Sequence, residues 1–128
     1  MNQVSNIMLK AAITAVGGYV PDTVLSNQDL EKMVDTNDEW IRSRTGIKER
    51  RILKDPTKAT SFLAIQAAND LISKKDLDPT TIDLVLVATI TPDMHVAATA
   101  AYVASSIGAT NAFAYDLNAV MEHHLYTL

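Results

Sequence analysis

Apolar residues recur at two different spacings along this chain, and these spacings predict strands and helices. Residues 11–16 (AAITAV) are apolar and run into Gly17 and Gly18, which predicts a strand that meets a turn. Residues 84–90 (LVLVATI) and 112–117 (AFAYDL) are apolar at successive positions. Such runs are typical of strands that are covered on both faces in a parallel sheet.

Between these runs the apolar spacing changes to that of a helix. From residue 60 to about residue 74, one stripe holds Phe62, Leu63, Ile65, Ala68, Leu71 and Ile72. Residues 97–107 form an alanine-rich segment that Gly108 is expected to stop. Asp78 and Pro79 predict a turn, and residues 91–96 (TPDMHV) predict a loop.

Polar residues mark where two earlier helices start. Ser26 precedes Asp29 by three residues, and Thr36 precedes Glu39 by the same spacing, so each pair predicts an N-terminal cap. Gly46 is expected to end the second helix in a left-handed conformation, and residues 47–53 (IKERRIL) are expected to be extended and mostly exposed. The order of elements predicts an α/β layered domain.

Length and composition limit the possible functions. The 128 residues suit one domain or half of a larger one, and no linker or repeat divides them. A net charge of −4 argues against a nucleic-acid partner, and the absence of cysteine excludes disulfides and cysteine catalysis within these residues. The N-terminus does not resemble a signal peptide and no apolar run is long enough to span a bilayer, so we expect no membrane partner and a cytoplasmic location.

A basic cluster surrounds the single tryptophan, Trp40. It consists of Arg42, Arg44, Lys48, Arg50 and Arg51. Arginine can grip phosphate through paired hydrogen bonds and an indole can stack on a purine, so one interpretation is a site for a nucleotide-like ligand. The other is a solvated helix end beside an exposed strand, with Trp40 as a core anchor.

The remaining chemistry-bearing residues give weaker signals. His95 lies in the loop after a predicted buried strand, where α/β proteins build sites, but a lone histidine there is usually an ordinary surface residue. Adjacent His123 and His124 would point about 100° apart on a helix, so we expect no metal site. Residues 116–119 predict a strand-to-helix elbow of the kind that activates a nucleophile, or a plain crossover. Met121 offers no nucleophile there.

Two stretches resemble β-ketoacyl-acyl-carrier-protein synthase III, the condensing enzyme that starts bacterial type II fatty acid synthesis. They are MVDTNDEWIRSRTGIKERR and VATITPDMHVAATAAYVASSIGATNAFAYDLNA, and the resemblance runs from about residue 11 to residue 119. It implies a thiolase-like fold, in which two αβα halves form a five-layer sandwich. Residues 1–128 would then be a single incomplete domain, equivalent to most of the N-terminal half.

The resemblance also assigns roles to residues. Trp40 matches the position that stacks on the adenine of coenzyme A, Arg44 matches a phosphate contact, and Thr36 lies beside them. Val96 falls near the position that reaches the partner subunit's acyl pocket. Met121 stands where the family has its nucleophilic cysteine, and the family's catalytic histidine and asparagine belong to the second half.

Two interpretations of function follow from this resemblance. The first is the N-terminal part of a synthase III, inactive as this chain, whose family condenses acetyl-CoA with malonyl-acyl carrier protein without a metal or resident cofactor. The second is a non-catalytic module that binds coenzyme A or acyl carrier protein, or a subunit that complements a separate second half. The first interpretation predicts self-association, because the apolar face that packs on the missing half would be left exposed, and a well-behaved monomer would count against it. Acyl-chain preference is open in either case.

Overall fold

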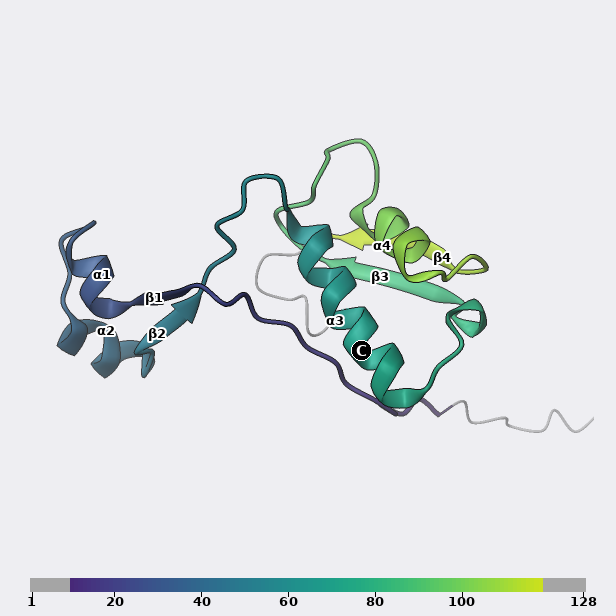
Figure 1. Ribbon diagram of the computed structural model, residues 1–128, viewed down its shortest axis with the longest axis horizontal. Coiled ribbons are helices and arrows are strands. Elements are labelled where there is room, and N and C mark those ends of the chain that lie inside the picture. Colours follow the sequence, from purple (N-terminus) through teal and green to yellow (C-terminus); the bar gives the residue numbers. More distant parts are fainter. Residues whose placement is uncertain (1–9, 119–128) are drawn as a thin grey trace, which may run out of the picture.

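A computed structural model describes residues 10–118, whose elements form two groups (Figure 1). The first, here called the N-terminal lobe (residues 24–51), contains β1 (Val24–Ser26), α1 (Asn27–Glu31), α2 (Asp38–Thr45) and β2 (Glu49–Arg51). The second, the sheet lobe (residues 60–117), contains α3 (Thr60–Lys75), the 3₁₀ helix η1 (Pro79–Thr81), β3 (Leu84–Ala88), α4 (Thr99–Ile107) and β4 (Phe113–Leu117). The predicted α/β class is confirmed.

Signals that act within a few residues place several helix ends where the sequence predicts them. Ser26 and Asp29 form a reciprocal capping box at the start of α1. Gly46 ends α2 at φ 72° and Gly108 ends α4 at φ 81°, both in the left-handed region that glycine enters without steric cost. The 16-residue helix α3 begins at the predicted residue, Thr60.

The predicted cap of α2 at Thr36 is wrong by one residue. Asn37 is the N-cap, with extended backbone, and its side-chain oxygen accepts a 2.8 Å hydrogen bond from the Trp40 N–H. Asparagine caps at least as well as threonine, so the helix starts where the better cap is available. Strands β1 and β2 pair antiparallel beside these helices, a pairing that the sequence pattern did not predict.

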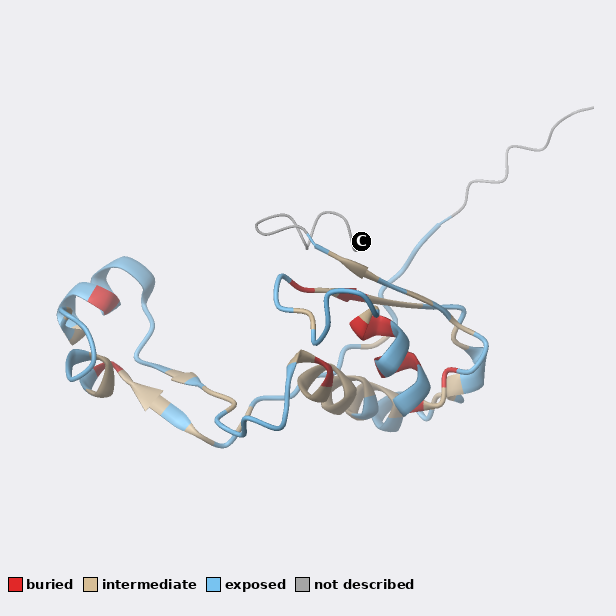
Figure 2. Cartoon of the chain, turned by 90° about the horizontal axis from the view of Figure 1, so that it is seen from above, coloured by how far each residue is buried: buried red, intermediate tan, exposed pale blue. Residues whose placement is uncertain are grey.

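The sheet lobe is built on two parallel strands joined by α4. Val85 pairs with Ala114 and Val87 with Asp116 in the β3–β4 ladder. The core cluster lies between this side of the ladder and α4, and Ala64, Ile65 and Ala68 of α3 pack against it. Figure 2 shows the buried residues gathered mainly where helix and sheet meet. Small alanine side chains allow this close approach of helix and sheet.

The expectation that both strands are covered on both faces is wrong for the described residues. Leu84 is 48% exposed, Phe113 82% and Tyr115 50%, and all three lie on the face of the sheet opposite α4. Both helices of the lobe pack on the other face, which leaves these apolar side chains uncovered. The sequence correctly predicts two apolar strands, but no element within residues 10–118 covers the second face of the sheet that they form.

Residues 11–16 are not a strand. A strand needs a neighbour to satisfy its backbone groups, and this segment pairs with no other strand in the described part of the chain. It leads instead to α3, where the Gly18 N–H donates to the Asp70 carboxylate at 2.9 Å. Ile13 and Val16 consequently remain about three-quarters exposed, at 73% and 74%.

Two aspartates cap helices of the sheet lobe from a distance. Asp116, in β4, accepts hydrogen bonds from the N–H groups of Thr99 and Ala100 at 2.8 and 2.7 Å, at the start of α4. Asp93 accepts from the Ser61 N–H at 2.9 Å, at the start of α3. Neither helix has a side-chain cap of its own, so these carboxylates replace one. None of the helices within residues 10–118 has the length and apolarity to cross a bilayer.

Candidate functional site

Helix α2 carries the two side chains that the sequence singled out most strongly. Trp40 and Arg44 lie four residues apart on the same helix face, and the Arg44 guanidinium lies 5.2 Å from the centre of the indole ring. Trp40 is 54% exposed, so the interpretation of this residue as a core anchor is wrong. An exposed indole with an adjacent guanidinium presents a flat apolar surface beside a fixed positive charge.

Thr36 lies beside the same indole. It lines a hollow of about 200 Å³ together with Asp35, Asn37 and Trp40. The structure therefore brings Thr36 and Trp40 to one depression, and Arg44 contacts the same ring from further along the helix. The backbone hydrogen bond from Trp40 to Asn37 fixes the first turn of α2, from which the indole projects.

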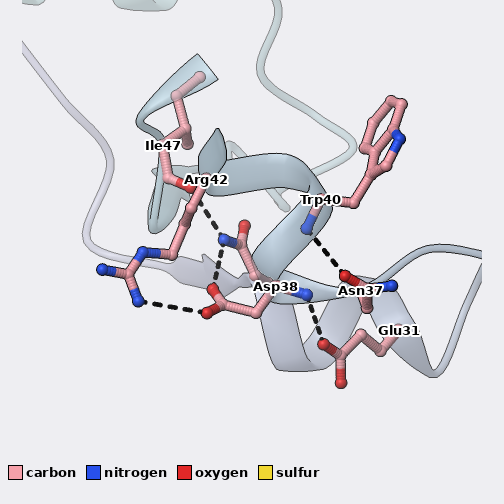
Figure 3. Close-up of polar contacts among 7 residues, drawn as sticks. Glu31, Asn37, Asp38, Trp40, Arg42 and Ile47 are labelled. Carbon is pink, nitrogen blue, oxygen red and sulfur yellow. Dashed lines mark hydrogen bonds and ion pairs between the residues drawn. The ribbon is translucent and has the colours of Figure 1, made fainter. Parts of the chain in front are cut away.

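Asp38 is the polar centre of the helix start (Figure 3). Its N–H donates to Glu31 Oε1 at 2.6 Å, and Arg42 Nη1 lies 3.4 Å from its Oδ2. Asn27 Nδ2 donates to its Oδ1 at 2.7 Å. The Asn27 hydrogen bond and, to a lesser extent, Arg42 hold the pKa of the Asp38 carboxyl below its ordinary value, because both stabilise the ionised form.

The basic side chains of the predicted cluster do not form one continuous surface for a ligand. Arg50 donates to the Leu25 carbonyl at 3.3 Å, and Arg51 donates to the carbonyls of Pro21 and Asp22 at 3.4 and 3.3 Å. These two arginines therefore brace the antiparallel β1–β2 pair and the chain that leads into β1. Arg42 and Lys48 line a second, open hollow on the lobe, where the acidic Asp38 and Glu39 offset much of their charge.

The other candidate residues lie elsewhere. Val96 is 100% exposed in the loop between β3 and α4, which belongs to the sheet lobe rather than to the surface of α2. His95 is exposed in the same loop. Among residues 10–118 there is no group of three potential metal ligands. The elbow interpretation at Met121 and the histidine pair His123–His124 lie outside the described residues.

One residue that matters for this surface was missed by sequence reasoning. Asn27 is fully buried beneath α2, and no motif marks it. The only signal was an asparagine at the first position of a helix, directly after the capping serine. Asparagine is a poor helix former in that setting unless its side chain has a partner.

Curated relatives match nearly the whole chain. It is 61% identical over 120 residues to the β-ketoacyl-[acyl-carrier-protein] synthase III of Chlorobium chlorochromatii and 52% identical to that of Porphyromonas gingivalis. Each match covers 94% of this chain and 36% of the relative, so the chain spans little more than a third of the length of these relatives. No family model matches the chain.

Solved structures agree with the sequence relatives. The 3-oxoacyl-[acyl-carrier-protein] synthase III of Aquifex aeolicus superimposes with a TM-score of 0.81 at 42% identity, covering 88% of this chain and 36% of that one. The Thermus thermophilus β-ketoacyl-[acyl-carrier-protein] synthase III gives 0.76 at 46% identity, covering 85% and 33%. The fold is thus part of a thiolase-like α/β fold. The chain corresponds to the N-terminal part of the longer β-ketoacyl-[acyl-carrier-protein] synthase III proteins that it matches.

Proposed function

We propose that this chain supplies the coenzyme A-contacting part of a β-ketoacyl-[acyl-carrier-protein] synthase III. In that role Trp40 stacks on the adenine, Arg44 contacts a phosphate and Thr36 lines the adjoining hollow. The observation that carries the proposal is the exposed indole with a guanidinium 5.2 Å from its ring centre, on a helix whose first turn is fixed by hydrogen bonds. Coenzyme A thioesters act here as substrates, and acyl carrier protein is the expected macromolecular partner.

The 128 residues by themselves are proposed to carry no condensing activity. The family reaction requires a thiolate that accepts an acetyl group and releases it again. Met121 stands at the corresponding position of the sequence, and a thioether has no proton to lose and cannot form and release a thioester. The histidine and asparagine that assist decarboxylation come from the family's second half. We therefore assign no catalytic residue within this chain.

The uncovered sheet face favours a second candidate role. Leu84, Phe113 and Tyr115 expose apolar surface on one side of the β3–β4 ladder. A face of this kind in a stable protein is normally buried by another layer. A chain that pairs with a separately supplied second half, or with another copy of itself, would cover it. Val96, fully exposed in the loop above α4, is the proposed contact with a partner's acyl pocket.

Calorimetric titration with coenzyme A tests the first role. Stacking of a base on an aromatic side chain contributes about 1–3 kcal/mol, so Trp40→Ala is expected to weaken binding by about tenfold or more. Arg44→Ala should also weaken it, whereas Tyr102→Ala, an equally exposed aromatic residue on α4, should not. Pantetheine, which lacks adenine and phosphate, should bind the parent chain and Trp40→Ala alike. An absence of heat with coenzyme A and the parent chain would refute the proposal.

A further inference from the structure

The N-terminal lobe is held together through one buried amide side chain. Asn27 is 0% exposed. Its Nδ2 donates to Asp38 Oδ1 at 2.7 Å and to the Ile47 carbonyl at 2.8 Å, and its backbone N–H donates to the Lys48 carbonyl at 3.1 Å. One residue of α1 therefore contacts the first residue of α2 and the turn that follows α2.

Apolar packing contributes little to this lobe. Ile41, at 8% exposed, is the one buried hydrophobic residue between residues 24 and 51, while Met33, Val34 and Ile47 are 68%, 57% and 44% exposed. With so little apolar surface buried between α1 and α2, directional hydrogen bonds decide how the two helices sit. Asn27 supplies two of these bonds from a single nitrogen.

Among residues 10–118, the buried Asn27 amide has hydrogen-bond partners for its nitrogen but none for its oxygen. Asn27 Oδ1 is buried and accepts no hydrogen bond within the described part of the chain. Leaving such an oxygen unsatisfied disfavours the folded state. An apolar side chain would avoid that cost but could not donate to Asp38 and Ile47 together. The two N–H donors of this amide are thus the feature that the fold uses.

The contact at Asp38 leads directly to the ligand-facing side chains. Asp38 is the first residue of α2, and Trp40 follows two positions later in the same turn. Figure 3 shows the Trp40 indole projecting on one side of this turn and the Arg42 side chain on another. A shift of Asp38 would move the first turn of α2, which includes Trp40. Glu31 of α1 also accepts a hydrogen bond from the Asp38 N–H, so α1 holds this residue through two contacts.

We propose that Asn27 is a positioning residue for coenzyme A: it fixes the first turn of α2 and thereby the direction in which Trp40 and Arg44 face the ligand. This inference rests on the proposed function. Asn27 does not contact the ligand itself. Its effect passes through Asp38 and the Ile47 carbonyl, which hold α2 at its start and just past its end.

Replacing Asn27 with aspartate gives a pH-dependent effect, which distinguishes the positioning role from a general loss of stability. Asn27→Asp is nearly isosteric and sets a second carboxylate against Asp38. At pH 7 the two charges repel, while at acidic pH one carboxyl becomes protonated, since paired carboxylates raise one pKa of the pair. Its single O–H can then restore the hydrogen bond between residues 27 and 38 but not the second one, to the Ile47 carbonyl. Glu31, Arg42 and Lys48 are the other charged groups near this pair.

Trp40 is the only tryptophan in the chain, so its emission reports on α2 without a label. We expect Asn27→Asp at pH 7 to shift this emission and to weaken coenzyme A binding by about tenfold, the effect of losing a buried hydrogen bond. Both changes should partly reverse at pH 5, because protonation restores one of the two hydrogen bonds. Asn27→Ala should show the same losses without recovery. Asn69→Asp, the same substitution at an exposed site on α3, should match the parent chain at both pH values.

The results separate the two proposals. If the parent chain binds coenzyme A and Asn27→Asp binds it equally well at pH 7, the positioning role is wrong. If the parent chain binds no coenzyme A, the proposed function fails, and the positioning of α2 is then judged from the Trp40 emission alone. An emission unaffected by Asn27→Asp at either pH would overturn that as well. Should Asn27→Ala fail to fold, the acid recovery of Asn27→Asp still decides the matter.

Discussion

Replacing Asp116 with alanine should destabilise the sheet lobe more than any other single change of an aspartate in it. The carboxylate accepts hydrogen bonds from the N–H groups of Thr99 and Ala100 at 2.8 and 2.7 Å. Ala98, the residue that precedes α4, has no side chain that could take over. Both donors are buried, so alanine would leave them without a partner and without water.

The size of the effect follows from these two contacts. A lost N-terminal cap costs about 0.5–2 kcal/mol, and a hydrogen bond to a charged group contributes about 1.5–3 kcal/mol. For two such bonds that share one carboxylate, we expect a loss of about 3 kcal/mol. At about 4 °C per kcal/mol for a domain of this size, Tm should fall by about 12 °C. Asp116→Asn keeps one acceptor oxygen and should lose roughly half as much.

Urea unfolding followed by circular dichroism measures this difference. Asp83→Ala is the matched control, because Asp83 is exposed just before β3 and its side chain makes no hydrogen bond within residues 10–118. The expected order of midpoints is parent and Asp83→Ala highest, Asp116→Asn intermediate and Asp116→Ala lowest. Equal midpoints for Asp116→Ala and Asp83→Ala would show that the carboxylate does not act as the cap of α4.

Two further predictions concern the surroundings of the sheet lobe. A Cβ on Gly17 would lie 2.6 Å from both the Cβ and the backbone nitrogen of Leu71, whereas one on Gly18 would meet nothing within 4 Å. Gly17→Ala should therefore lower stability by about 1–3 kcal/mol in urea unfolding and Gly18→Ala by much less, and equal effects would contradict the contact with α3. Sedimentation velocity should show concentration-dependent association of the parent chain that Phe113→Glu weakens and Tyr102→Glu, on α4, does not. A parent chain that stays monomeric at all concentrations would refute the role of the open sheet face.

Local chemistry was readable from the sequence, and its predictions were largely confirmed. The capping box of Ser26 and Asp29 needs only residues three apart, and the left-handed ends at Gly46 and Gly108 need only the absence of a Cβ. The start of α3 followed from its apolar stripe. The error at Thr36 was of the same local kind, because two adjacent residues, Thr36 and Asn37, could both cap α2 and the stronger one did.

Contacts between distant residues were not readable in this way. The coverage of a sheet face depends on where α3 and α4 settle, so an apolar strand such as β4 looks the same in sequence whether one face or both are covered. Residues 11–16 have the composition of a strand but lack a neighbouring strand among the described residues. Propensity cannot supply such a partner.

By itself the sequence determined the class of the fold, the ends of most helices and the family motif that includes Trp40 and Arg44. These properties arise from side chains within one or two turns of each other, or from a pattern carried along the chain. Only the tertiary structure decided that Asn27 ties α1 to α2, because its partners Asp38 and Ile47 lie 11 and 20 residues further along the chain. The same holds for Asp116, which caps a helix that begins 17 residues earlier. Hydrogen bonds form between groups that folding brings within about 3 Å, and no local periodicity encodes that distance.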